Sequence, residues 1–182
     1  AMNGLKNMSS ESSTLHGVAV ADYPDWKGQS FDSSGVLRAF NVLHLRRIFS
    51  EMRRTMPEDC AINQMISNYG QLDNYYEVIA GRQEFDGAKM KADYGITELT
   101  WEGCDWLIDP YCENNRIYIL DKRKVQKIIL RPLKIDDRDG NTFRLLSTGD
   151  SIWGRLTGYM ELVCKVRKAV GVYADLAEPE LP

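Results

Sequence analysis

The fold of this chain is decided by residues 95–131, which read GITELTWEGCDWLIDPYCENNRIYILDKRKVQKIILR. Runs rich in β-branched and aromatic residues start at Ile96, Trp106 and Ile117, and glycine, proline and asparagine residues separate them. Such runs between turn-forming residues indicate short strands with tight connections. The stretch carries no catalytic motif, so we interpret it as a sheet that supports loops rather than as a reaction centre.

Length, composition and charge narrow the class of protein. A chain of 182 residues with 43% hydrophobic residues can bury one ordinary core, with or without an extension, which argues against wholesale disorder. The formal net charge of −3 does not predict general attraction to nucleic acid. No apolar run approaches the roughly 20 residues of a membrane span, so we expect no membrane partner.

The clearest helix is expected from Ser34 to Met56. Apolar residues recur there at spacings of three and four, beginning at Val36, and define one apolar face. Asp32, Ser33 and Ser34 are its candidate N-caps, because their side chains accept hydrogen bonds from the first free amides of a helix.

The other expected elements follow the same rules of periodicity and punctuation. They are short strands at Gly17–Ala21, Cys60–Ser67 and Phe143–Leu146, a helix at Tyr69–Ala80, a flexible loop at Arg82–Tyr94, and a turn at Lys134–Gly140. From Leu156 to Val166 apolar and polar residues alternate, which predicts a long strand exposed on one face. Ala169–Leu176 is expected to extend this strand past a break at Gly171. The order of elements predicts an α+β fold.

Tests for chemistry find no recognisable site. The sequence contains no nucleophile elbow, Walker loop or dinucleotide-binding glycine motif. His16 and His44 lie near no nucleophile motif, and we interpret them as surface or packing residues. The four cysteines have no C-x-x-C spacing, which argues against zinc and favours reduced, mostly buried thiols. We therefore expect no catalytic, cofactor-binding or metal-binding residue.

Two groups of charged residues remain open to interpretation. Four arginines in the C-terminal half of the first helix complement the helix dipole, or alternatively contact a partner's acidic surface or packaged nucleic acid. Four acidic residues of the decisive stretch could pair as acid and base, but the sequence identifies no specific pair. These groups are Arg46, Arg47, Arg53 and Arg54, and Glu98, Glu102, Asp105 and Asp109.

The order of short motifs along the chain resembles tailed-bacteriophage major capsid proteins with the Hong Kong 97 fold. Each motif is short, and their common order is the specific part of the resemblance. The motifs are Gly4-Leu5-Lys6-Asn7, the helix to Met56, Ile62 to Asn68, Glu102-Gly103, Asp109-Pro110, Ile117 to Asp121, and Trp153 through Arg167-Lys168-Ala169 to Leu176.

This resemblance implies an axial domain with a mixed sheet and flanking helices, plus the closing long strand of a peripheral domain. The expected division is a polar leader at 1–16, the axial domain at 17–150, the peripheral-domain strand at 151–177 and a tail at 178–182. Family members carry an N-terminal arm, an extended loop and a spine helix before the Gly-Leu-x-Asn segment, and these segments have no match here. The resemblance therefore implies a fragment of a longer protein.

The resemblance further implies a structural subunit of an icosahedral shell, of a tailed phage or prophage, in which pentamers and hexamers enclose the genome. Such a protein is not an enzyme and needs no cofactor. Its partners would be copies of itself, with scaffold, portal or decoration proteins as further candidates, and packaged double-stranded DNA by non-specific contact. It would belong to the virion and assemble in the host cytoplasm.

Residues in charged sets and turns are the candidate contacts between subunits. They are Arg46, Arg47, Arg53, Arg54, Glu102, Glu113 and Asn114, with the acidic set above as a complement to the arginines. Three other readings stay open at this point: an encapsulin-like nanocompartment shell, an unrecognised metal-dependent enzyme that uses Asp105 and Asp109, and an adaptor that binds another protein.

Overall fold

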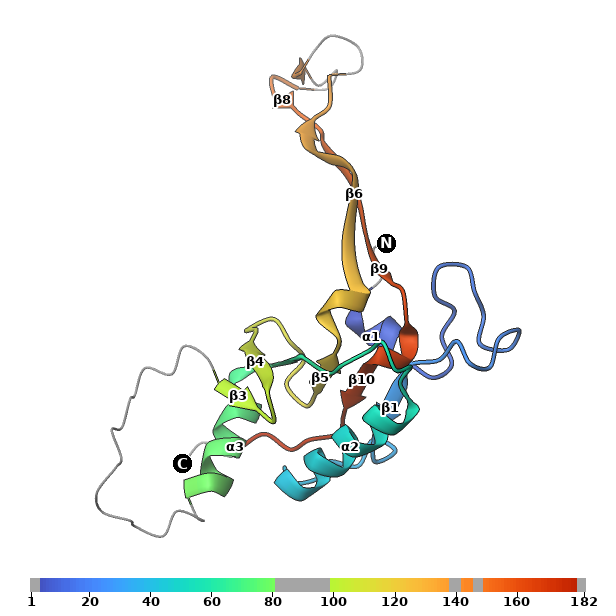
Figure 1. Cartoon of the computed structure of the whole chain (residues 1–182). Helices are drawn as coiled ribbons and strands as arrows, with labels where there is room; N and C mark the ends of the chain where they lie inside the picture. The colour runs from blue at the N-terminus through green and yellow to red at the C-terminus, as the bar shows by residue number, and fades with distance from the viewer. Residues whose placement is uncertain (1–3, 81–98, 138–141, 146–148, 180–182) are drawn as a thin grey trace.

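The computed structural model describes residues 4–80, 99–137, 142–145 and 149–179. A body of helices and a sheet carries a long two-stranded arm, which projects away from it (Figure 1). The helices are α1 (Leu5–Ser9), α2 (Val42–Thr55) and α3 (Tyr69–Ala80), with short 3-10 turns η1 (Lys122–Lys124) and η2 (Arg167–Ala169). The expected α+β class and the helix at Tyr69–Ala80 are confirmed.

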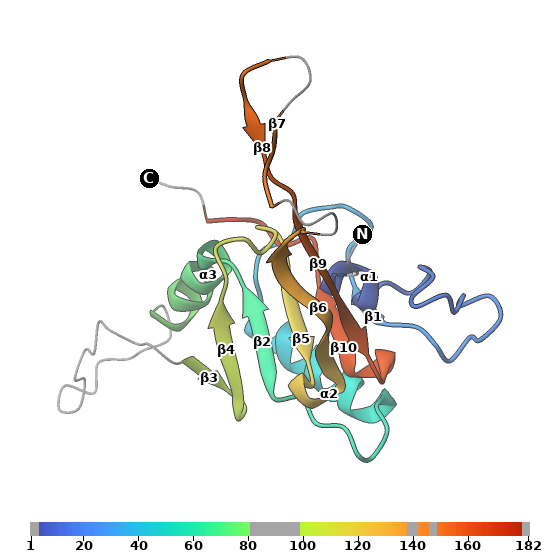
Figure 2. The same ribbon diagram turned by 90° about the horizontal axis from the view of Figure 1, so that it is seen from above.

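Six strands of the body form one mixed sheet in the order β1-β10-β5-β2-β4-β3 (Figure 2). They are β1 (Gln29–Phe31), β2 (Gln64–Ser67), β3 (Leu99–Trp101), β4 (Cys104–Ile108), β5 (Ile117–Leu120) and β10 (Val170–Tyr173). β1 is parallel to β10 and β2 is parallel to β4, while the other neighbours are antiparallel. The three strand runs expected in residues 95–131 are confirmed as β3, β4 and β5.

The main core lies between this sheet and α2. Leu45, Ile48, Phe49 and Met52 lie on one face of α2 and are at most 2% exposed. A Cβ atom added to Gly171 would come within 2.7 Å of the Met52 Sδ. A larger residue at this position would force the end of the Met52 side chain to move within the core.

The opposite face of the sheet is covered by α1. Met8, at the end of this short helix, packs with Leu120, Cys164 and Val170 in a second buried cluster. The second cluster joins the N-terminal segment to the place where the arm meets the body. None of the helices in the described part of the chain has the length and apolarity needed to cross a membrane.

The arm consists of β6 (Val125–Ile135) and β9 (Leu156–Cys164), paired antiparallel from Val125↔Cys164 to Ile135↔Leu156. β7 (Arg144–Leu145) and β8 (Ile152–Trp153) pair with each other at its far end (Figures 1 and 2). The strand expected from Leu156 is confirmed as β9, and β7 falls within the strand expected at Phe143–Leu146. β6 was not predicted, because its apolar run IILRPL has no strict alternation.

The expected start of the first helix is wrong. α2 begins at Val42, because the Asn41 side chain accepts hydrogen bonds from the amides of Leu43 and His44 and caps the helix there. The preceding residues turn instead: Ser34 has φ +57° and Gly35 has φ +81°. Apolar spacing also misjudged which residues are buried, because Val36, Leu37 and Leu43 are 66%, 61% and 56% exposed.

The strand expected at Gly17–Ala21 is also wrong. This segment forms turns with an isolated bridge between Leu15 and Val18, and His16 and Gly17 both have positive φ values. Two successive residues in the left-handed region reverse the chain direction and cannot continue a strand.

Two further boundaries differ from expectation. β2 covers only the last four residues of the run expected to begin at Cys60, because Ala61 donates its amide hydrogen to a carboxylate instead of a strand neighbour. Ala169–Leu176 does not extend β9, because η2 separates the two and β10 enters the body sheet with Gly171 inside it. Lys134 and Ile135 belong to β6 rather than to the expected turn, whose Asp139-Gly140 lies outside the described residues, as does the loop expected at Arg82–Tyr94.

Candidate functional site: the apolar arm and the joint at its base

One face of the arm is apolar and open to solvent. Directly opposed residues of two antiparallel strands point to the same face of the ribbon. Ile129 lies opposite Met160 and Ile135 lies opposite Leu156, and both pairs belong to this face. Leu133 packs over Gly158, where an added Cβ atom would come within 3.1 Å of the Leu133 Cδ1. The exposed fractions are 50% for Ile129, 62% for Leu133, 41% for Ile135 and 59% for Leu156. We call these residues, with Met160, the apolar face of the arm.

The other face of the arm is mixed in character. Arg131 lies opposite Tyr159 and Ile128 lies opposite Glu161. The guanidinium of Arg131 lies 3.9 Å from a carboxylate oxygen of Asp136, at the limit of an ion pair. The alternation along β9 therefore separates an apolar from a more polar face, as its sequence predicted. The expectation that only one face is exposed is wrong, because Leu156 on the apolar face is exposed as well as Tyr159 on the other.

A two-stranded ribbon with one bare apolar face is marginally stable by itself in water. Contiguous exposed apolar surface of this kind marks an interaction surface in soluble proteins. In the part of the chain that the structure describes, no other element covers this face. The apolar face of the arm is therefore the first candidate functional surface.

The base of the arm is built around the buried carboxylate of Asp121, whose side chain has 0% exposure. Its oxygens accept hydrogen bonds from the Ala61 amide at 2.9 Å and from the Asn63 side-chain amide at 3.0 Å. Arg123 donates to the same carboxylate from its backbone amide, its Nε at 3.0 Å and its Nη2 at 2.9 Å. The carboxylate thus joins the start of β6 to the segment that connects α2 to β2.

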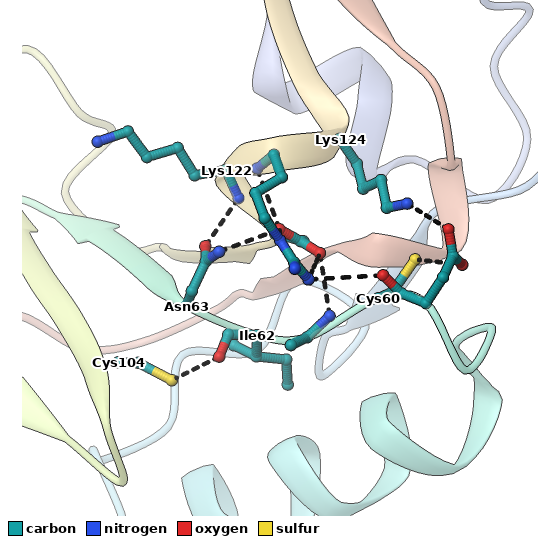
Figure 3. A network of polar contacts seen from close by, with 10 residues as sticks. Cys60, Ile62, Asn63, Cys104, Lys122 and Lys124 are labelled. Carbon is teal, nitrogen blue, oxygen red and sulfur yellow. Dashed lines mark hydrogen bonds and ion pairs between the residues drawn. The ribbon is translucent and has the colours of Figure 1, made fainter.

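Two neighbouring contacts complete this network (Figure 3). The Asn63 side-chain oxygen accepts a hydrogen bond from the Lys122 amide at 2.8 Å, and Lys124 forms an ion pair with Asp59 beside Cys60. Burial alone raises the pKa of the Asp121 carboxyl, but the hydrogen bonds from Arg123 and Ala61 outweigh burial and lower the pKa to about 2. The carboxylate therefore stays charged at neutral pH.

The returning strand of the arm carries a second buried charge, Arg167, which is 1% exposed. All three of its guanidinium nitrogens donate to the N-terminal segment. The acceptors are the carbonyl oxygens of Asn7, Met8, Ser10, Ser13 and Trp26 and the hydroxyl of Ser13, at 2.6–3.2 Å. Burial lowers the pKa of this guanidinium. Neither Asp121 nor Arg167 was predicted to have a functional role.

The residues predicted as subunit contacts lie elsewhere on the body, and most have partners within the chain. Glu102 accepts from Arg53 at 3.0 Å and lies 3.5 Å from Arg46, while Arg54 pairs with Glu51 one helical turn away. The structure therefore brings part of the arginine set and part of the acidic set together within one chain.

Two of the three remaining predicted contacts, Glu113 and Asn114, also have partners within the chain. Arg47 is exposed on α2. The carboxylate of Glu113 pairs with Lys6 and Arg116 at 2.9 and 2.8 Å. The backbone carbonyl of Asn114 accepts from the Gln71 side chain at 2.8 Å, which ties this turn to α3.

The acidic residues and cysteines considered as candidates for chemistry occupy different settings. A carboxylate oxygen of Asp109 accepts a hydrogen bond from the Tyr111 amide, and Asp105 is exposed on β4, while Glu98 lies outside the described residues. The four cysteines are free, and burial raises the pKa of Cys112 and Cys164 to about 11, which leaves them protonated and unreactive at neutral pH. Across the described residues, no three His, Cys, Asp or Glu side chains gather as metal ligands.

Comparison with solved structures gives the fold. A chain in the structure of the cyanophage A-1(L) capsid asymmetric unit matches with a TM-score of 0.64 at 14% sequence identity, over 92% of this chain and 56% of that chain. A chain in the structure of the satellite phage P4 procapsid including size determination (Sid) protein matches with a TM-score of 0.50 at 12% identity, over 93% and 58% respectively.

This chain therefore spans a little over half the length of the solved chains that it matches. No protein-family model and no curated protein matches the sequence. At such low identity the likeness establishes the fold, and the phage capsid protein fold predicted from the order of motifs is confirmed.

Proposed function

We propose that this chain is a structural subunit of a bacteriophage capsid shell, in which copies associate into pentamers and hexamers that enclose the genome. The observation that carries this proposal is the likeness in fold to the cyanophage capsid chain over 92% of the residues. A shell protein acts through its surfaces and needs no reaction centre.

The apolar face of the arm supports the same proposal. A shell requires large contact surfaces between its components, and such permanent interfaces are more apolar than the rest of a protein surface. The exposed side chains of Ile129, Leu133 and Leu156 provide a surface of this kind on an element that projects from the body. On this proposal, the apolar face becomes covered in the assembled shell.

The proposed ring contacts are heterologous, so that one patch on each subunit meets a different patch on the next and closes a ring. Arg47 and Arg54 stay exposed on α2 after the pairing of Arg46 and Arg53 with Glu102. With Glu113 and Asn114 they remain our candidate polar contacts. Double-stranded DNA, scaffold, portal and decoration proteins remain candidate partners, and the virion remains the proposed location.

Electron microscopy and mass photometry test the proposal. This 182-residue sequence and the longest reading frame that contains it are expressed side by side, each alone and with the products of neighbouring genes. We expect closed shells from the longer product, and monomers or small rings from this sequence. Small discrete oligomers from both products under every condition would overturn the proposal.

A control addresses the enzyme alternative that relied on Asp105 and Asp109. Thermal melting is recorded with magnesium, manganese and zinc, because an ion that binds the folded state raises the melting temperature. The capsid proposal predicts no shift with any of the three ions. A shift that Asp105→Asn abolishes would favour the metal-dependent alternative.

A further inference from the structure

The arm is a continuation of two neighbouring strands of the body sheet. β5 leads through η1 into β6, and β9 leads through η2 into β10. β5 and β10 are antiparallel partners, as β6 and β9 are, so one long ribbon runs from the body into the arm. The ribbon is interrupted between its Leu120↔Val170 and Val125↔Cys164 pairs. We call residues 121–124 and 165–169 the joint.

Backbone pairing across the joint is sparse. The Asp121 amide donates to the Ala169 carbonyl at 3.0 Å, and the Lys165 amide donates to the Lys124 carbonyl at 2.8 Å. An uninterrupted ladder would set the direction of the arm through a regular series of hydrogen bonds. At the joint, contacts made by side chains have to fix the direction of the arm in place of these backbone hydrogen bonds.

Each strand of the joint contains one buried charged side chain, and each charge is bound to a different part of the body. Asp121 is held by Ala61 and Asn63, in the connection from α2 to β2. Arg167 is held by carbonyl oxygens between Asn7 and Trp26, in the N-terminal segment. The two strands of the arm are therefore anchored by directional contacts to two different segments of the body, the connection from α2 to β2 and the N-terminal segment.

We propose that Asp121 and Arg167 are positioning residues that set the angle of the arm to the body. The consequence for shell geometry rests on the proposed function, whereas the angle itself is a property of the single chain. The two residues lie far apart in the sequence, and the fold brings both to the joint.

The choice of charged residues has a physical reason. Apolar contacts are non-directional, so an apolar joint could slide with little cost. A buried charge that leaves its partners loses several hydrogen bonds at once and stays desolvated, which makes intermediate angles unfavourable. Two such anchors on the two strands restrict both bending and twisting of the arm.

Distance measurements on the single chain test the inference. Spin labels are introduced through unnatural amino acids at Lys134 on the arm and at exposed Asp73 on α3, which avoids the four native cysteines. Pulsed EPR then gives the distribution of distances between the labels. We expect a narrow distribution for the parent chain and one at least about twofold wider for Asp121→Asn and for Arg167→Lys.

Asp59→Asn is the matched control, because it removes the exposed ion pair with Lys124 in the same region but leaves the Asp121 carboxylate in place. It should leave the distribution narrow. Circular dichroism and hydrogen exchange of α2 and β5 establish that the body of each variant is folded. Unchanged distance distributions in folded Asp121→Asn and Arg167→Lys would overturn the inference.

Milder variants decide the question if either substitution unfolds the body. Asn63→Ala removes one donor to the Asp121 carboxylate, and Ser13→Ala removes one hydroxyl contact to Arg167. A wider distribution in either of these folded variants supports the inference, and the parent distribution in both overturns it.

A second readout separates this inference from the proposed function. In the longer reading frame, Asp121→Asn should lower the fraction of closed shells and raise the fraction of open or misshapen ones, while Asp59→Asn should not. If the parent never forms shells but the distributions widen as expected, the proposed function fails and the positioning role stands. If shells form and the distributions stay narrow, the positioning role fails.

Discussion

The body and the arm use the same kind of strand pairing but bury their side chains very differently. All four residues of β5 are buried, whereas β6, which continues it, is exposed along most of its length. The body sheet is covered by α2 and α3 on one face and partly by α1 on the other (Figure 2). The body therefore buries its apolar side chains within the chain, whereas the apolar side chains of the arm need another surface to cover them.

The largest effect on stability is expected for Arg167→Met. The substitution removes the donors to five carbonyl groups in buried or part-buried hydrogen bonds, so the free energy of unfolding should fall by about 3 kcal/mol in urea titrations. Lys168→Met, one residue further on, removes only the contact with exposed Asp25 and should change little. Equal effects of the two variants would show that the buried hydrogen bonds do not hold the N-terminal segment on the body.

Acid titration separates Asp121 from the other carboxylates. Its folded-state pKa of about 2 lies below the ordinary value of 3.8, so its contribution to stability is present above about pH 4 and is lost as the pH falls towards 2. Because Arg123 is exposed, solvent screens its charge, and the contribution of Asp121 to stability is about 1 to 2 kcal/mol. The difference in unfolding free energy between the parent and Asp121→Asn should therefore shrink across that range. A difference that stays constant would contradict the assignment.

Alanine substitutions at Gly171 in the body and at Gly158 in the arm compare the packing of these two regions. An alanine Cβ at Gly171 would meet the flexible end of the Met52 side chain at 2.7–2.8 Å, and because Met52 is fully buried its shift should cost about 1 kcal/mol in thermal or chemical unfolding of the body. Gly158→Ala on the arm would meet Leu133 at 3.1–3.2 Å, a milder contact next to solvent. The body transition should barely respond to Gly158→Ala. A larger effect at Gly158 would mean that the arm unfolds together with the body.

The smallest effect on stability is expected on the apolar face of the arm. Leu133→Ser with Leu156→Ser should change unfolding of the body by less than about 0.5 kcal/mol, because both side chains are largely exposed. The same variant should reduce self-association in sedimentation velocity and the yield of shells from the longer reading frame. Lys134→Ser on the arm is the control. Normal shells from the double variant would exclude the apolar face as a shell contact.

The charged residues show how far sequence reasoning reached into the candidate site. Arg46, Arg53 and Glu102 were predicted as contacts between subunits, and the structure pairs them within one chain. Whether these residues also meet a neighbour stays a prediction. The sequence does not show whether the partner of an exposed charged residue lies on the same chain or on another, because a carboxylate on either chain satisfies an arginine equally well.

Local patterns were enough to predict the elements whose stability depends on near neighbours. The runs at β3, β4 and β5, the helix α3 and the two faces of β9 all follow from residue type, turn residues and periodicity within short windows. Tertiary contacts decided the turn before α2, the place of β10 and the joint. Asp175, for example, accepts from the amides of Ser33 and Gly35, more than 100 residues away, and so takes the expected cap residues into a turn. Directional bonds between segments so far apart leave no periodic pattern, and only the folded chain brings their partners together.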